Sequence, residues 1–162
     1  MFILKTIIWG SIFLLVALIV GPWLALQFDT SFPHFYLGPW RYIGALLFAA
    51  GSLFAVYCAF ILFTPGKSRP APYDAGGTFT IAGPYRYVRN PFMFAIIIAL
   101  WGEAIFMERL AMVAYAFIIT WMVHFWVIFF EEPALEERFG EEYDAYRKAV
   151  PRWFPHFRRF EG

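Results

Sequence analysis

The sequence contains little charge and almost no cysteine. Only 15% of its 162 residues are charged, against about 25% in an average soluble domain, and Cys58 is the single cysteine. One thiol excludes an internal disulfide framework and a zinc site built from several thiolates. The formal net charge of +1 gives no electrostatic basis for binding nucleic acid, so we expect no nucleic-acid partner.

Several common functional motifs are also missing. The sequence contains no G-x-G, which excludes a Rossmann fingerprint, no G-x-x-x-x-G-K-[ST] P-loop, and no G-x-S-x-G nucleophile motif. His34, His124 and His156 lie on different segments and show no metal-binding spacing. We therefore expect no metal site.

Apolar and aromatic residues dominate the composition. Hydrophobic residues make up 61% of the chain and aromatic residues 23%, and the mean hydropathy is +0.59. A soluble domain of this size exposes roughly a third of the surface that its unfolded chain would expose. Such an apolar chain could not keep that surface in water, so the expected solvent is lipid.

Four apolar segments predict four transmembrane helices, at residues 7–28, 42–63, 92–107 and 110–130. The last two segments, separated by Glu108-Arg109, predict a helical hairpin. A signal peptide is the alternative for the first segment, but its apolar run is longer than usual and no small-residue cleavage site follows it. We expect an all-α integral membrane protein that forms one domain over residues 1–162.

The basic residues predict the orientation in the membrane. Eleven of the 13 lie near the N-terminus, in the loop 64–91 or in the tail 131–162, while Arg41 and Arg109 lie at the opposite ends of the spans. By the positive-inside rule, both termini and the loop face the cytoplasm.

The loop 64–91 is rich in proline and glycine, which prevents a long helix over most of its length. A connection this long is uncommon and often functional. At its end, Asn90 suits a helix N-cap and Pro91 the first helical position. A helix start beside Arg86 and Arg89 suits a carboxylate-bearing ligand, and contact with lipid headgroups is the alternative.

The tail 131–162 predicts a cytoplasmic amphipathic helix that begins at Glu131-Glu132 and stops at Pro151. The two acids act either as helix-dipole partners or as ligands for ribose hydroxyls or an ammonium group. His124 lies two turns before Glu131, and it is either satisfied by a neighbouring helix or functional. The predicted apolar stripe of the helix consists of Leu135, Phe139, Tyr143, Tyr146 and Val150.

Two segments resemble the motifs of a known family. Gly83-Pro84-Tyr85-Arg86-Tyr87-Val88-Arg89-Asn90-Pro91 is similar to G-x-Y-x-x-x-R-[HN]-P. The segment from Glu131 to Arg152 is similar to E-E-x-x-L-x-x-x-F-G-x-x-Y-x-x-Y-x-x-x-V-P-R. This pattern is that of the isoprenylcysteine carboxyl methyltransferase family and its bacterial relatives, which include phospholipid methyltransferases. The resemblance covers roughly residues 64–155.

The resemblance implies an integral membrane enzyme that binds S-adenosylmethionine at the cytoplasmic face and releases S-adenosylhomocysteine. Its substrate would be a lipophilic or membrane-embedded small acceptor with a carboxylate, amine or thiol, and membrane lipids would be further partners. The location would be a prokaryotic inner membrane. The implied cofactor contacts are Gly77, Thr78, Phe79, Thr80, Tyr85, Asn90, Met93 and Glu131. The candidate catalytic residues are Arg89, Asn90 and His124.

The chain departs from the farnesylcysteine enzymes at three positions. Asn90 stands where they have His, Met93 where they have Tyr, and Val127 where they have an acceptor-contacting Arg. The cofactor half of the site is therefore expected and the prenylcysteine half is not. Two alternatives remain open: a non-enzymatic membrane scaffold or subunit, and an NADPH enzyme similar to the sterol reductases.

Overall fold

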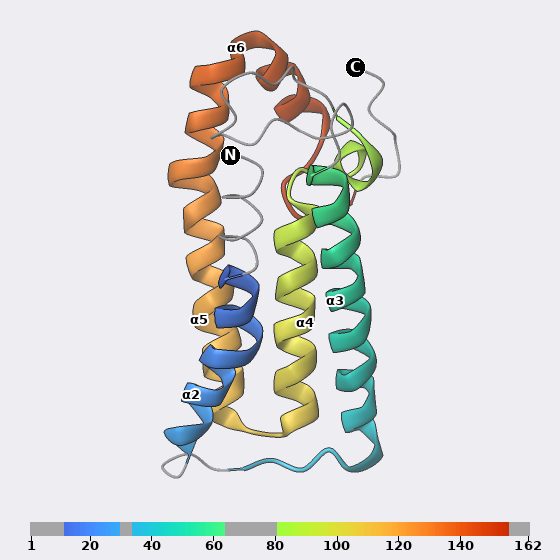
Figure 1. Cartoon of the computed structure of the whole chain (residues 1–162), viewed down its shortest axis with the longest axis vertical. Helices are drawn as coiled ribbons and strands as arrows, with labels where there is room; N and C mark the ends of the chain where they lie inside the picture. The colour runs from blue at the N-terminus through green and yellow to red at the C-terminus, as the bar shows by residue number, and fades with distance from the viewer. Residues whose placement is uncertain (1–11, 30–33, 64–80, 156–162) are drawn as a thin grey trace. The chain divides into compact units, whose positions relative to one another are not determined.

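A computed structural model of the chain describes residues 12–29, 34–63 and 81–155 (Figure 1). Within these ranges 84% of the residues are helical and no strand is present. The all-α prediction is thus confirmed for the described residues.

Within the described residues the predicted apolar segments are helical, but the helix that begins at Leu110 continues past the predicted end at residue 130 as far as Ala149. In chain order the main elements are η1 (Val16–Val20), α2 (Gly21–Gln27), η3 (Gly38–Trp40), α3 (Arg41–Phe63), α4 (Pro91–Met107) and α5 (Leu110–Trp126). Two helices, Gly38–Leu62 and Leu110–Ala149, are long and apolar enough to cross a membrane by length and composition. The helices Ile12–Gln27 and Pro91–Met107 are apolar but shorter.

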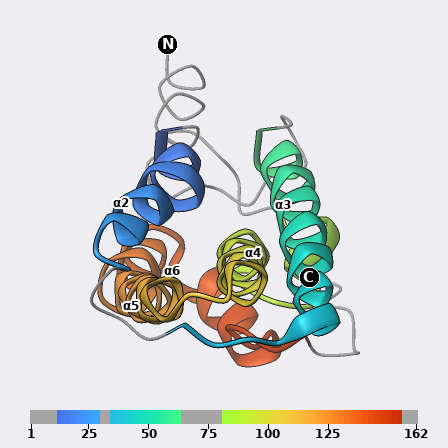
Figure 2. The ribbon, with the colours of Figure 1, turned by 90° about the horizontal axis from the view of Figure 1, so that it is seen from below.

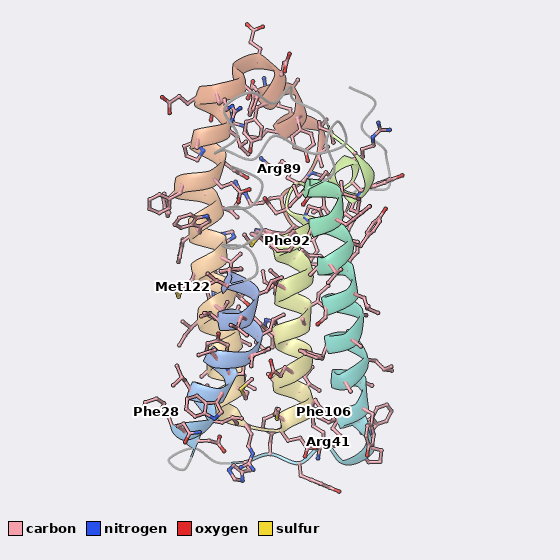
Figure 3. The ribbon with its side chains drawn as sticks, viewed as in Figure 1. Phe28, Arg41, Arg89, Phe92, Phe106 and Met122 are labelled. Atoms are coloured by element: carbon pink, nitrogen blue, oxygen red, sulfur yellow. The ribbon has the colours of Figure 1, made fainter. Side chains whose placement is uncertain are left out.

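The break between α4 and α5 is a turn anchored to the start of α3. Glu108 adopts a left-handed φ of 56°, and its Oε1 accepts the backbone N–H of Leu37 at 2.8 Å. Its Oε2 lies 3.4 Å from Nη1 of Arg41. The Arg41 guanidinium in turn lies 4.7 Å from the ring centroid of Phe106 (Figure 3). Glu108, one of the two charged residues predicted to separate the helices, therefore also fixes the α4–α5 turn.

The contacts divide the chain into two units. Unit 1 consists of Met1–Phe54 and Ala95–Val123, and unit 2 of Ala55–Phe94 and His124–Gly162. Both units are discontinuous in sequence. The expectation of one domain over the whole chain stays a prediction.

Glycines in unit 1 let α3 and α4 pack backbone to backbone, and the end-on view shows the two helices side by side (Figure 2). A Cβ atom on Gly102 would lie 2.4 Å from the backbone nitrogen of Phe48 and 2.7 Å from the carbonyl oxygen of Gly44. A Cβ atom on Gly51 would lie 2.7 Å from the carbonyl oxygen of Ala95. Any larger residue at these positions would force the helices apart, because the atoms it meets belong to backbone.

Polar side chains connect the other helices of unit 1. The Tyr115 hydroxyl on α5 donates to the carbonyl oxygen of Ala17 in η1 at 3.1 Å. The indole N–H of Trp101 on α4 donates to Oγ1 of Thr120 on α5, also at 3.1 Å. Each of these hydrogen bonds satisfies a polar group whose burial in an apolar environment would otherwise cost free energy.

Unit 2 contains the short helix η4 (Gly83–Arg86), the π-helix η5 (Val127–Glu131) and α6 (Glu132–Ala149). The sequence predicts an amphipathic helix that begins at Glu131-Glu132, but in the structure α6 continues η5 without a break and is itself bent. Gly140 has φ 50° and ψ −120° and bends α6. Only glycine adopts this backbone conformation without strain.

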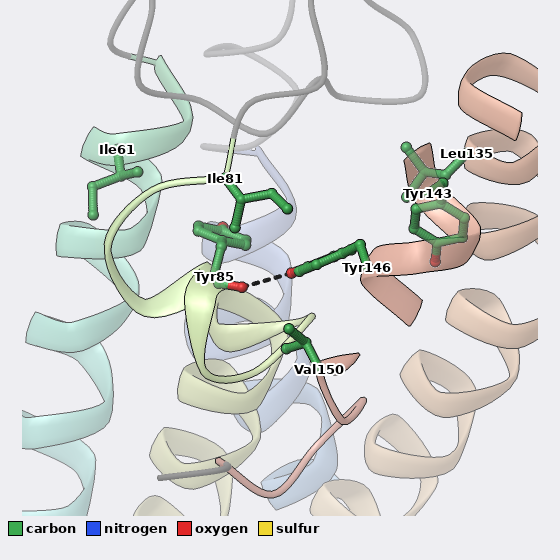
Figure 4. Packing of buried hydrophobic residues seen from close by; sticks show 7 residues of the cluster. All are labelled: Ile61, Ile81, Tyr85, Leu135, Tyr143, Tyr146 and Val150. Atoms are coloured by element: carbon green, nitrogen blue, oxygen red, sulfur yellow. Dashed lines mark hydrogen bonds between the residues drawn. The ribbon is translucent and has the colours of Figure 1, made fainter. Parts of the chain in front are cut away.

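An apolar cluster forms the core of unit 2 (Figure 4). Its buried members are Ile61, Ile81, Tyr85, Leu135, Tyr143, Tyr146 and Val150, and Phe139 packs partly against them. All five residues of the predicted apolar stripe therefore face this cluster. The stripe is confirmed, although the helix that carries it is bent.

Candidate functional site

The first motif lies at the start of α4. Pro91 is the first residue of this helix, and the carbonyl oxygen of Asn90 accepts the N–H of Phe94 at 2.9 Å. These observations confirm the predicted helix start. Pro is tolerated at this position because the N–H of a first helical residue has no partner within the helix. Just before it, the Arg86 side chain donates from Nε to the carbonyl oxygen of Ile81 at 3.0 Å.

A buried carboxylate joins the two motifs. Oε1 of Glu132 lies 3.0 Å from Nη1 of Arg89, and both side chains are 8% exposed. Arg152 donates to the same carboxylate through two nitrogens, Nε to Oε1 at 2.7 Å and Nη2 to Oε2 at 2.8 Å. This fork geometry gives strong, directional pairing. The hydrogen bonds to Glu132 raise the pKa of Arg152.

Backbone groups bring the same segments together. The N–H of Arg89 donates to the carbonyl oxygen of Pro151 at 2.9 Å, and the Asn90 amide lies 3.5 Å from the carbonyl oxygen of Arg152. The Tyr146 hydroxyl donates to the carbonyl oxygen of Tyr85 at 2.7 Å (Figure 4). The turn before α4 therefore meets the segment after α5 within unit 2.

The structure makes Glu132 the central acid, whereas the sequence analysis selected Glu131. Glu132 is buried and Glu131 is half-buried. Helical spacing offered a signal for this difference, because Glu132 lies three residues before Leu135 and therefore shares its face. Leu135 belongs to the apolar cluster. The role of Glu131 as a cofactor contact stays a prediction.

The remaining predicted site residues have varied surroundings. Tyr85 is 2% exposed and packs in the apolar cluster, so its ring is part of the core of unit 2. Met93 is half-buried in the first turn of α4. His124 accepts a hydrogen bond at Nδ1 from the indole N–H of Trp153 at 2.9 Å. The predicted contacts at Gly77, Thr78, Phe79 and Thr80 lie outside the described residues.

Charged residues cover the outer surface of α6. Arg147 donates to both carboxylate oxygens of Glu136, at 2.9 and 3.2 Å, across the bend at Gly140. Hydrogen bonds from Lys148 and then Arg147 lower the pKa of Asp144. These pairs are partly or fully solvent-exposed, so each contributes little to stability.

We also looked for possible metal ligands that lie close together in the part of the chain that the structure describes. No group of three or more His, Cys, Asp or Glu residues within it could hold a metal ion. Glu132, Glu136 and Asp144 instead pair with arginine or lysine side chains of unit 2.

Comparison with known protein families gives a match over most of the described chain. The model of the phospholipid methyltransferase family matches residues 40–142, which include the first motif and Glu131-Glu132. No curated protein matches the chain, and no solved structure matches it either. Because the family model covers more than half of the chain, the protein belongs to the phospholipid methyltransferase family of membrane methyltransferases, which is also the family of the isoprenylcysteine carboxyl methyltransferase-like proteins.

Proposed function

We propose that the protein is an integral membrane methyltransferase that uses S-adenosylmethionine and methylates a lipophilic acceptor. Family membership supports methyl transfer, and the two long apolar helices support a membrane location. The observation that carries the proposal is the cluster of Arg89, Glu132 and Arg152, because it joins the two motifs that the resemblance assigns to the cofactor.

The residue types in unit 2 fit this cofactor. The cluster has two guanidinium groups and one carboxylate, so its three side chains carry a formal charge of +1. A guanidinium pairs well with a carboxylate such as that of the methionine moiety. The Glu131 carboxylate suits ribose hydroxyls or the ammonium group, and the Asn90 amide can both donate and accept.

When bound, S-adenosylmethionine supplies an electrophilic methyl group on its sulfonium. The protein then has to hold the acceptor atom about 3 to 3.5 Å from that carbon and in line with the bond that breaks. It also has to keep water out of the site. The apolar cluster of unit 2, with Tyr146 bonded to the Tyr85 carbonyl, gives the site a rigid and dry support.

The same proposal includes a topology. Four spans cross a prokaryotic inner membrane, with the helices Ile12–Gln27 and Pro91–Met107 as the two short ones. Both termini and α6 lie in the cytoplasm, where the basic residues are concentrated. A fluorescent reporter that matures only in the cytoplasm, fused after Gly162, tests this orientation. A dark fusion that is nonetheless expressed and membrane-bound contradicts it.

Binding of S-adenosylhomocysteine to the full chain in detergent tests the cofactor proposal. We expect calorimetric binding of this product and none of NADPH. Glu131→Ala should weaken the binding about tenfold or more, which corresponds to about 1.4 kcal/mol. Cys58→Ala, which changes a small buried core residue, should leave the affinity unchanged and serves as the control.

Methyl transfer from labelled S-adenosylmethionine to a lipid extract tests the activity itself. The expected labelled product partitions into organic solvent, and its headgroup identifies the acceptor as a carboxylate, amine, thiol or phospholipid. A protein that neither binds S-adenosylhomocysteine nor labels any lipid is instead a membrane scaffold or subunit.

A further inference from the structure

The segment after α6 places an indole against the histidine at the end of α5. Nε1 of Trp153 lies 2.9 Å from Nδ1 of His124, and the two ring centroids are 5.9 Å apart with planes inclined by 35°. Both residues are half-buried and both belong to unit 2. Neither the composition nor the motifs of the sequence assign a role to Trp153.

The chemistry of the two rings fixes the direction of this bond. An indole N–H can only donate, so Nδ1 of His124 must be the acceptor and carries no proton. The proton of the neutral imidazole is therefore on Nε2. Toward its other neighbours, and toward any bound molecule, the Nε2 position of His124 then acts as a donor.

The position of Trp153 is held by the residues directly before it. The carbonyl oxygen of Pro151 accepts the N–H of Arg89 at 2.9 Å, and the Arg152 guanidinium is bonded to both oxygens of Glu132. Three consecutive residues are therefore tied to three different segments of unit 2. A side chain anchored in this way can hold its partner in one orientation.

We propose that Trp153 is a positioning residue that holds His124 in the Nε2–H tautomer, so that His124 meets the methyl acceptor as a hydrogen-bond donor. This role rests on the proposed function. A histidine whose Nδ1 lone pair is occupied and whose Nε2 carries the proton cannot take a proton from the acceptor. His124 is therefore not the base in the proposed reaction, and what it offers the acceptor is the N–H at Nε2.

Nitrogen-15 NMR of the full chain in nanodiscs, with labelled histidine, tests the tautomer independently of any activity. The sequence has three histidines, so the loss of one signal in His124→Gln assigns the resonance. We expect an unprotonated Nδ1 and a protonated Nε2 in the neutral wild type. Trp153→Phe, which keeps a ring but removes the N–H, should yield a mixture of tautomers.

A matched control lies next to the substituted residue. Phe154 is 78% exposed, and Phe154→Leu should leave the His124 signals unchanged. A wild-type spectrum with a protonated Nδ1, or an unchanged tautomer in Trp153→Phe, overturns the proposal.

Methyl-transfer kinetics test the donor role. Trp153→Phe should lower kcat by about twofold at unchanged KM for S-adenosylmethionine, because in a mixture of tautomers about half of the molecules lack the proton on Nε2. His124→Gln retains an N–H donor but cannot act as a base, so it should keep most of the wild-type kcat, while His124→Ala should not. Equal loss in the Gln and Ala variants overturns the donor role. A wild type without activity on any lipid refutes the proposed function, and the NMR result then decides the tautomer alone.

Discussion

Loss of the Glu132 charge should destabilise unit 2 far more than loss of any carboxylate on the outer surface of α6. The carboxylate of Glu132 lies 3.0 Å from Arg89 and both side chains are only 8% exposed. Removing one partner of a buried ion pair costs about 3 to 5 kcal/mol, because the other charge stays buried without compensation. The pair with Arg152 adds less, since that side chain is 30% exposed and solvent screens it. We expect Glu132→Gln to lower the free energy of unfolding by about 3 kcal/mol.

Equilibrium unfolding by SDS in mixed micelles, followed by circular dichroism, measures this difference. The matched control is Glu136→Gln, which removes a carboxylate that is 48% exposed and should cost about 1 kcal/mol or less. The double variant Arg89→Gln with Glu132→Gln should be less destabilised than the sum of the single variants, because the two residues are in contact. Equal effects of the Glu132 and Glu136 variants, or additive losses in the double variant, would refute the reasoning.

Three further predictions follow from other contacts. Gly102→Leu should cost about 3 kcal/mol or more in the same SDS titration, because its Cβ would meet the carbonyl oxygen of Gly44 at 2.7 Å and backbone cannot move aside. Tyr146→Phe should cost about 1 to 3 kcal/mol by the same measurement, because it leaves the buried carbonyl of Tyr85 without this donor. Asp144 has a lowered pKa in the folded chain, so its carboxylate stabilises the fold above the ordinary value of about 3.9 and loses this effect as the pH falls through the folded value. The stability difference between wild type and Asp144→Asn should therefore be constant above about pH 5 and shrink as the pH falls below about 3.9.

Each of these predictions has a control or a contrary outcome. Ala49→Leu places the same side chain on the exposed side of α3 and should be neutral, and an equal loss there would show that the Gly102 effect is not steric. Tyr36 is 87% exposed, so Tyr36→Phe should not change stability. A difference between wild type and Asp144→Asn that stays constant with pH would contradict the proposed charge contribution.

Local signals in the sequence predicted the helices well. The break at Glu108-Arg109, the helix start at Asn90-Pro91 and the apolar stripe of the tail each depend on residues close together in the chain. Long apolar runs need no tertiary information to be identified as helices. The bend at Gly140 was missed, because a single glycine in a helical pattern is compatible with both a straight and a bent helix.

The site was predicted only in outline. The two motifs identified the segments that meet, but adjacent acids at a helix start give no direct indication of which one is buried. The partnership of Trp153 with His124 joins residues 29 apart in the chain, and no spacing rule predicts such a pair. Contacts of this kind depend on how segments that are distant in the sequence pack in the folded chain. Hydrophobic periodicity gives no information about that packing.

The division of unit 2 into two stretches of chain has a consequence for biosynthesis. Its first stretch ends at Phe94 and its second begins at His124, so the ribosome makes the intervening hairpin before Tyr146 can reach Tyr85. During translation the first motif therefore lacks its contacts until the segment from Glu131 to Arg152 has been made. A chain that stops before Val150 would lack the carbonyl of Pro151 and the guanidinium of Arg152. The contacts of these groups with Arg89 and Glu132 could then not form, and we expect quality-control proteases to degrade the truncated protein.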